Sequence, residues 1–181
     1  RLQSYPVIQL FDSAIWLEAD GTAGQWWGRD LRPSWASEAL AGRPGSGHPG
    51  LAWAARRDWI DRYGLWDRHV IGGGDAVMAL AFSGLDPGER FSMGELMRAS
   101  AREWQAKIWP IVGGQVGIVP GVIRHLWHGS LADRQYKERL KPAILNAFNP
   151  DRHLAIDDDG CYVWSEVIQQ ELRREVVENF W

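Results

Sequence analysis

The sequence predicts an α/β fold formed by a single domain. β-rich segments occur near the N-terminus, in the middle and near the C-terminus of the chain, and segments with apolar residues at helical spacing lie between them. Strands and helices that interleave in this way are typical of α/β or α+β proteins. The chain has 181 residues, which is enough to bury one core, and neither a repeat nor a clear boundary divides it. We therefore expect one domain over residues 1–181.

The expected elements of the first half follow from residue type and from the positions of glycine. β-branched and aromatic residues indicate strands, apolar residues at helical spacing indicate helices, and glycine clusters indicate turns. In chain order these elements are strand structure within 5–17, a long surface connection over 21–50, a strand over 51–55, a helix over 56–63 and a helix that opens at 73–75 and ends at Gly84.

The second half is expected to begin and end with helices. The acidic run at 157–160 lacks the alternating ligands and the distal Glu of a calcium loop, so we interpret it as a hairpin turn. In chain order the elements are a helix over 93–109, a strand over 115–119 continued by 122–126, a helix over 132–148 interrupted by Pro142, a hairpin formed by 154–156 and 161–164, and an amphipathic helix within 164–181.

Tryptophan is the compositional outlier, with 12 residues against 5 Phe and 4 Tyr. Its flat ring packs on the faces of sugars and equally anchors cores and interfaces, and we expect most of these side chains in the core. Trp26, Trp27 and Trp35 are the exceptions, because they lie in the glycine-rich connection that we predict to be a loop. The excess alone leaves both a sugar-binding and a structural interpretation open.

Composition limits the class of protein. The net charge of −3 provides no basic field that would attract nucleic acid. Cys161 is the single cysteine, so the chain has neither an internal disulfide nor a thiolate metal cluster, which fits a reducing compartment. No apolar run approaches the roughly 20 residues of a membrane-spanning helix, and no signal peptide is visible. We expect a cytoplasmic protein without a transmembrane segment.

The most informative stretch is 48–78. In it Gly72, Gly73 and Gly74 directly precede Asp75, which we expect at the start of a helix. A carboxylate at a helix N-terminus with so little bulk around it suits a site that must approach a polar substrate closely. The same pattern fits an ordinary helix cap, because Asp is a favoured N-cap residue. The residues alone leave these two interpretations open.

A second candidate site is the segment 123–129, which carries His125 and His128 after a short strand. Imidazoles are common ligands of divalent metals. In an extended segment the two rings point to opposite sides and only one faces a given site, whereas in a helical segment both do. A structural role for the pair stays open, and Trp127 between them fits either the core or the lining of a pocket.

These segments together resemble the C-terminal, acceptor-side half of a GT-A-type, family 2-like bacterial glycosyltransferase. That family's glycine-rich turn often ends Gly-Gly-Glu-Asp; here Gly74 stands at the Glu position and only Asp75 remains. The residues that carry the resemblance are Gly50, Ala52, Ala54, Arg56, Arg57, Gly64, Leu65, Asp67, Gly72–Asp75 and Ile123–His125.

The resemblance implies a partial GT-A-like mixed sheet flanked by helices, with a long Trp/Gly-rich loop and a C-terminal amphipathic helix. It implies that Asp75 is the general base that deprotonates an acceptor hydroxyl. It implies that His125, or His128 as the second choice, completes the coordination of Mn²⁺ or Mg²⁺ together with diphosphate oxygens. The residues that it places at the acceptor are Gly73, Gly74, Trp53, Trp26 and Trp27.

The resemblance also implies partners that this sequence does not provide. The Asp-x-Asp motif of the nucleotide-binding half is missing, so a nucleotide sugar would be bound by a missing N-terminal half or by a partner chain, unless the domain is non-catalytic. A sugar or glycan is the expected acceptor. The alternatives are a Trp-rich carbohydrate-binding or interaction domain and, more distantly, a nuclease built on His125 and Asp75, which lacks a basic groove.

Overall fold

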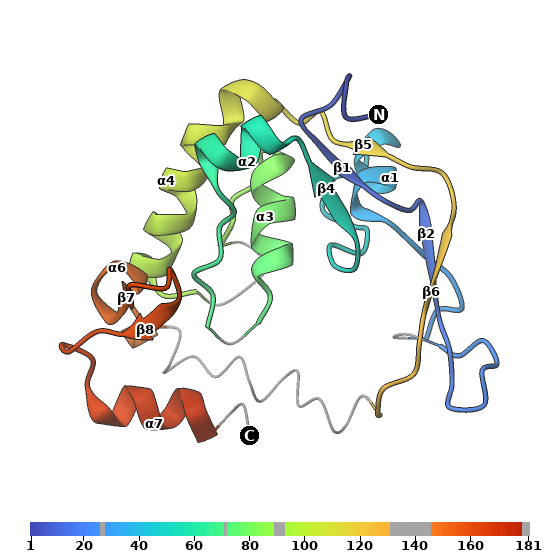
Figure 1. The fold of residues 1–181 in the computed structure, drawn as a ribbon. Coiled ribbons are helices and arrows are strands. Elements are labelled where there is room, and N and C mark those ends of the chain that lie inside the picture. The colour runs from blue at the N-terminus through green and yellow to red at the C-terminus, as the bar shows by residue number, and fades with distance from the viewer. Residues whose placement is uncertain (26–27, 71, 89–92, 131–145, 179–181) are drawn as a thin grey trace.

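The structure is a computed structural model that describes residues 1–25, 28–70, 72–88, 93–130 and 146–178. It is a mixed α/β protein with two small three-stranded sheets, a two-stranded hairpin and several helices (Figure 1). The expected α/β class is confirmed at this level. Within the described ranges, none of the helices combines the length and apolar character needed to cross a membrane.

The first sheet is built on β1 (Val7–Gln9). This central strand pairs antiparallel with β4 (Trp53–Ala55) and parallel with β5 (Gly117–Ile118). Val7 is opposite Ala55 and Gln9 is opposite Trp53. The residues of β1 are buried, which explains why the run is apolar apart from Gln9.

The second sheet continues the same two chain segments beyond a bend (Figure 1). Its central strand β2 (Ser13–Trp16) pairs antiparallel with β3 (Arg32–Pro33) and parallel with β6 (Val122–His125). At the bend the backbone N–H of Asp12 donates to the carbonyl of Gly121 at 2.9 Å. The parallel pairing therefore places the end of β6 beside the end of β2.

Three helices, α2 (Arg57–Tyr63), α3 (Gly74–Phe82) and α4 (Glu95–Val112), pack their apolar faces together beside the first sheet (Figure 1). The rings of Trp59, Phe82 and Trp104 lie 5.7 to 6.4 Å apart between centroids and form the centre of this core. The other helices that the structure describes are α1 (Trp35–Leu40), α6 (Pro150–His153) and α7 (Gln170–Glu178).

The connection over 21–50 is more structured than the sequence predicts. Trp35, expected in a loop, is the first residue of α1 and is fully buried, with its indole N–H donating to Ser83 Oγ at 2.7 Å. That expectation was wrong because Ser34 caps a helix: its Oγ accepts from the N–H of Ser37 at 3.0 Å. Trp26 and Trp27 lie outside the described residues.

The C-terminal part agrees with the sequence prediction where it is described. β7 (Leu154–Ile156) and β8 (Tyr162–Trp164) form the expected hairpin, and Asp157 Oδ1 accepts hydrogen bonds from the backbone of the turn. The amphipathic helix is the shorter α7, which buries Leu172 and Val176. The helix expected over 132–148 falls largely outside the described residues.

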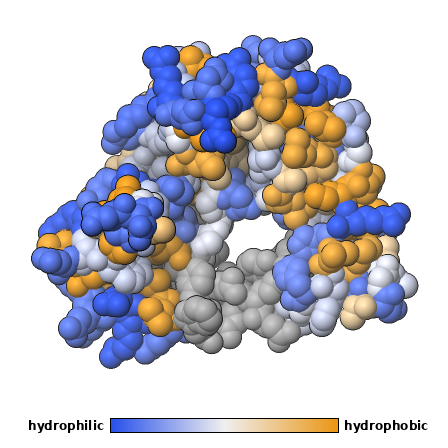
Figure 2. Space-filling view, viewed as in Figure 1, coloured by the Kyte–Doolittle hydropathy of each residue, from blue (hydrophilic) through white to orange (hydrophobic). Residues whose placement is uncertain are grey.

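Apolar and polar surfaces are segregated on the molecule. Figure 2 shows apolar residues gathered over β1 and β4, whereas the outer surface of α2 and α4 is hydrophilic. The candidate site lies on the strand side, where α3 begins below β4.

Candidate functional site

Asp75 is the second residue of α3 and its side chain is exposed. Gly73 occupies the cap position, so the alternative that Asp75 is the N-cap was wrong. Gly72 and Gly73 have φ values of 87° and 89°, a left-handed backbone that favours glycine and explains why the turn needs two of them. One carboxylate oxygen, Oδ1, accepts from the N–H of Ala76 at 2.8 Å.

A histidine that the sequence analysis did not select lies beside Asp75. A Cβ atom added to Gly50 would lie 2.6 Å from Oδ2 of Asp75 and 3.0 Å from Cε1 of His48. Both side chains therefore approach the bare backbone of Gly50, which only a glycine allows. The N–H of Gly50 donates to Nδ1 of His48 at 3.1 Å, so the proton of the neutral imidazole resides on Nε2.

The segment 48–51 is held in place by the side chain of Gln9 on β1. This buried amide donates to the carbonyls of His48 and Gly50 at 3.0 and 3.2 Å. Leu51 follows with φ 74°, a left-handed conformation that branched residues rarely adopt and that persists only when its surroundings impose it. Gln9 is part of what imposes it.

Trp16 links His48 to the end of β6. The centroid of its ring lies 4.9 Å from that of His48 and 5.7 Å from that of His125. Trp16 is buried at the end of β2 and is the register partner of His125. Parallel pairing of β2 with β6 thus brings the second candidate segment next to the first.

His125 and His128 face each other, with Nε2 atoms 3.2 Å apart and ring centroids 4.8 Å apart. β6 ends at His125 and the chain then leaves the strand conformation without forming a helix, so neither the extended nor the helical alternative describes this segment. We call the resulting series of contacts the acid–histidine row; in order it consists of Asp75, Gly50, His48, Trp16, His125 and His128.

The geometry of the pair fits two ligands of one cation. Two imidazole nitrogens, each about 2.1 Å from the same metal, are separated by about 3.0–3.4 Å. The observed 3.2 Å lies in that range, and it is also the length of a hydrogen bond between the two rings. In the described part of the chain, no group of three or more His, Cys, Asp or Glu side chains converges on one point. The pair therefore offers two ligands, and other positions would belong to water or to a bound ligand.

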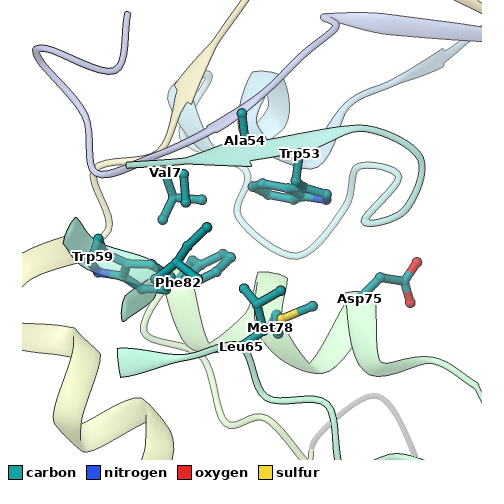
Figure 3. Close-up of a pocket in the computed structure, with 10 residues that line it drawn as sticks. Val7, Trp53, Ala54, Trp59, Leu65, Asp75, Met78 and Phe82 are labelled. Atoms are coloured by element: carbon teal, nitrogen blue, oxygen red, sulfur yellow. The ribbon is translucent and has the colours of Figure 1, made fainter. Parts of the chain in front are cut away.

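An apolar pocket of about 120 Å³ lies between β4 and α3, with Asp75 at one end (Figure 3). Nine of the ten described residues that line it are apolar. Trp53, a predicted acceptor-side residue, forms part of the wall, and its indole N–H donates to the carbonyl of Pro49 at 2.7 Å. Met78 and Leu65 form the opposite wall.

The predicted site residues thus divide into three groups. Asp75, Gly73, Gly74 and Trp53 lie together at the start of α3 and the adjoining pocket. His125 and His128 adjoin them through the acid–histidine row. Trp26 and Trp27 lie outside the described residues, so their expected place at the acceptor stays a prediction.

The other histidine near this turn, His69, is unsuited to proton transfer near neutral pH. Burial lowers its pKa to about 4, and a hydrogen bond with the Gly72 backbone opposes that shift only in part. Its ring lies 6.0 Å from that of Trp66, between centroids. His69 is therefore neutral and structural in this fold.

Comparison of this chain with protein-family models, with curated proteins and with solved structures finds no match. The function proposed below depends on the residues of the row and the pocket.

Proposed function

We propose that this chain supplies the acceptor side of a metal-dependent glycosyl-transfer site of the GT-A kind. The observation that carries the proposal is the acid–histidine row, which joins an exposed carboxylate to a facing pair of imidazoles. Such a reaction needs a carboxylate to take a proton and a cation to balance the leaving diphosphate. Two segments far apart in the sequence contribute both kinds of group to one region.

In this proposal Asp75 accepts the proton of the acceptor hydroxyl. The acceptor oxygen forms a bond to the anomeric carbon of the donor sugar while the bond from that carbon to the diphosphate breaks. The positive end of α3 and the hydrogen bond from Ala76 favour the ionised carboxylate. Oδ2 is the oxygen that borders Gly50 and His48, and a base must come within about 3 Å of the proton donor.

His125 and His128 would hold a divalent cation, whose charge stabilises the departing diphosphate. Imidazole ligands favour Mn²⁺ over Mg²⁺, because Mg²⁺ prefers carboxylate and water oxygens. Since the pair provides only two ligands, we expect weak binding of Mn²⁺ by the chain alone and tighter binding when a nucleoside diphosphate adds its oxygens. The nucleotide itself would be held by a nucleotide-binding half on a longer chain or a partner.

The test of the base is Asp75→Asn, which preserves size and removes the charge. With Mn²⁺, an acceptor and the required nucleotide-binding half present, we expect the transfer rate to fall at least about 100-fold. The measurement is release of nucleoside diphosphate from a panel of nucleotide sugars. Asp61→Asn, on the exposed surface of α2, is the matched control and should leave the rate unchanged. An unchanged rate for Asp75→Asn would overturn the assignment.

The same variant separates transfer from simple carbohydrate binding. If the chain bound sugars without nucleotide or metal, and Asp75→Asn bound them equally well, the non-catalytic carbohydrate-binding alternative would be favoured.

A further inference from the structure

We propose that the molecule presented to Asp75 carries an apolar group beside its hydroxyl, and that the pocket between β4 and α3 binds this group. The inference deepens the proposed function, because it specifies the class of acceptor: an amphipathic alcohol, with an alkyl or aryl group, and not a bare sugar. It rests on that function for the fate of the hydroxyl, and its own test requires neither nucleotide nor metal.

The size of the pocket suits a small apolar group. Its volume of about 120 Å³ is close to that of the cavities of about 150 Å³ that bind benzene. A single ring or a short branched alkyl group is therefore the size of ligand that it accommodates.

The chemistry of the walls excludes a sugar ring as the occupant. Asp75 is the only charged residue among the described lining residues, and the remainder provide aliphatic, thioether and aromatic surface. Sugar hydroxyls placed among these side chains would lose hydrogen bonds to water without replacement, at about 1–3 kcal/mol each. An apolar group gains free energy from the same burial.

The position of the carboxylate makes the pocket part of the site. In Figure 3 the side chains of Val7, Phe82 and Met78 surround the cavity, and Asp75 lies at one end, next to Trp53, with its carboxylate directed outward from the cavity. A molecule whose apolar group fills the cavity thus has its polar end at Asp75. The arrangement orders the two parts of the ligand: apolar group inside, hydroxyl at the rim.

The strand β4 provides a matched pair of variants. Trp53 and Ala55 share one face of the strand, the face that packs on the helical core, because side chains alternate. Ala54 also borders the pocket, but its side chain points to the other face of the strand, away from the cavity (Figure 3). Ala55→Leu should fill the pocket, whereas Ala54→Leu adds the same atoms on the opposite side.

The experiment titrates the full chain with benzyl alcohol and follows the NMR signals of the Met78 methyl group and the Trp53 indole. We expect saturable shifts for benzyl alcohol and none for glycerol, a polyol without an apolar group. Affinity should fall at least tenfold in Ala55→Leu and stay within twofold of wild type in Ala54→Leu.

Two results would overturn the inference. One is the absence of saturable shifts with benzyl alcohol; the other is unchanged affinity in an Ala55→Leu variant whose spectrum shows it to be folded. If the pocket is only a packing void, benzyl alcohol gives no saturable shifts, and Ala55→Leu raises the midpoint of thermal unfolding because it fills the void. These outcomes do not depend on glycosyl transfer. An unchanged transfer rate in Asp75→Asn would therefore refute the proposed function but would not affect the result for the pocket.

Discussion

Gly50 is the residue on which the shape of the site depends most directly. Its missing side chain lets the Asp75 carboxylate and the His48 ring approach the same stretch of backbone. Its N–H also fixes the tautomer of His48. One small residue thus controls both the spacing and the protonation pattern at one end of the acid–histidine row.

We predict that Gly50→Ala changes the geometry of the site strongly but lowers the stability of the protein only slightly. The added methyl group meets side-chain atoms that rotate away, so the free energy of unfolding should fall by only about 1 kcal/mol. The NMR signals of His48 Hε1 and of the Asp75 side chain should nevertheless shift strongly, because both groups are displaced. Urea unfolding and two-dimensional NMR measure the two effects.

Gly72→Ala is the matched control for that variant. Among the described residues that are not its chain neighbours, no atom lies within 4 Å of a Cβ at Gly72, but its φ of 87° makes alanine costly by about 1–2 kcal/mol. The control should therefore lose more stability than Gly50→Ala while the His48 signal stays in place. The opposite ranking would contradict the role given to Gly50.

At the scale of elements, Gln9 connects β1 to α1 and to segment 48–51. Its carbonyl oxygen accepts from the N–H of Ala36 at 3.0 Å, and its amide group serves the carbonyls of His48 and Gly50. A polar residue in a buried strand is costly unless fully paired, and here one bond joins β1 to α1 and two join it to segment 48–51.

We predict that Gln9→Leu destabilises the protein by about 2–4 kcal/mol, since three backbone groups, two of them in buried hydrogen bonds, lose their partner. Gln105→Leu, which removes bonds to the carbonyls of Ala81 and Leu85 from a partly buried position, should cost about half as much. Urea unfolding measures both. Equal costs would show that Gln9 has no special part in holding segment 48–51.

The elements were largely predictable from sequence because their signals are local. The helix that opens after Gly73 and the hairpin around residues 157–160 each follow from neighbouring residues. The helix that begins at Trp35 was missed, because glycine and proline on both sides outweighed a six-residue apolar pattern. His48 was missed as a site residue for a different reason: its neighbours Asp75 and Trp16 come from distant segments, so only the tertiary structure reveals them.

At the scale of the whole molecule, the site extends from the start of α3, across segment 48–51, to the end of the second sheet. The site is as stable as the fold around it, and the partly buried His69 makes the stability of the fold depend on pH. The folded state keeps this imidazole neutral down to about pH 4, whereas the unfolded chain protonates it near pH 6.5. The unfolded state thus binds more protons between these values, and stability rises with pH across that window.

We predict that the free energy of unfolding falls by up to about 3 kcal/mol as pH drops from 6.5 to 4, because of His69. His69→Leu should remove this contribution, leaving a difference from wild type that is constant above pH 6.5 and changes below it. The burial-lowered pKa of His153 acts in the same direction, so His153→Gln is the comparison variant. If plots of the free energy of unfolding against pH ran parallel for wild type and His69→Leu, the pH dependence could not be assigned to His69.

The central claim is that Asp75 and the histidine pair belong to one metal-dependent site, and paramagnetic broadening by Mn²⁺ tests it most directly. In NMR spectra of the full chain, we predict that Mn²⁺ first broadens the signals of His125, His128 and the Trp16 indole, then the Gly50 amide, and spares the hairpin turn at Gly160. The double variant His125→Gln, His128→Gln should lose this pattern. Broadening that persists in the double variant, or that centres on other acidic residues, would contradict the account.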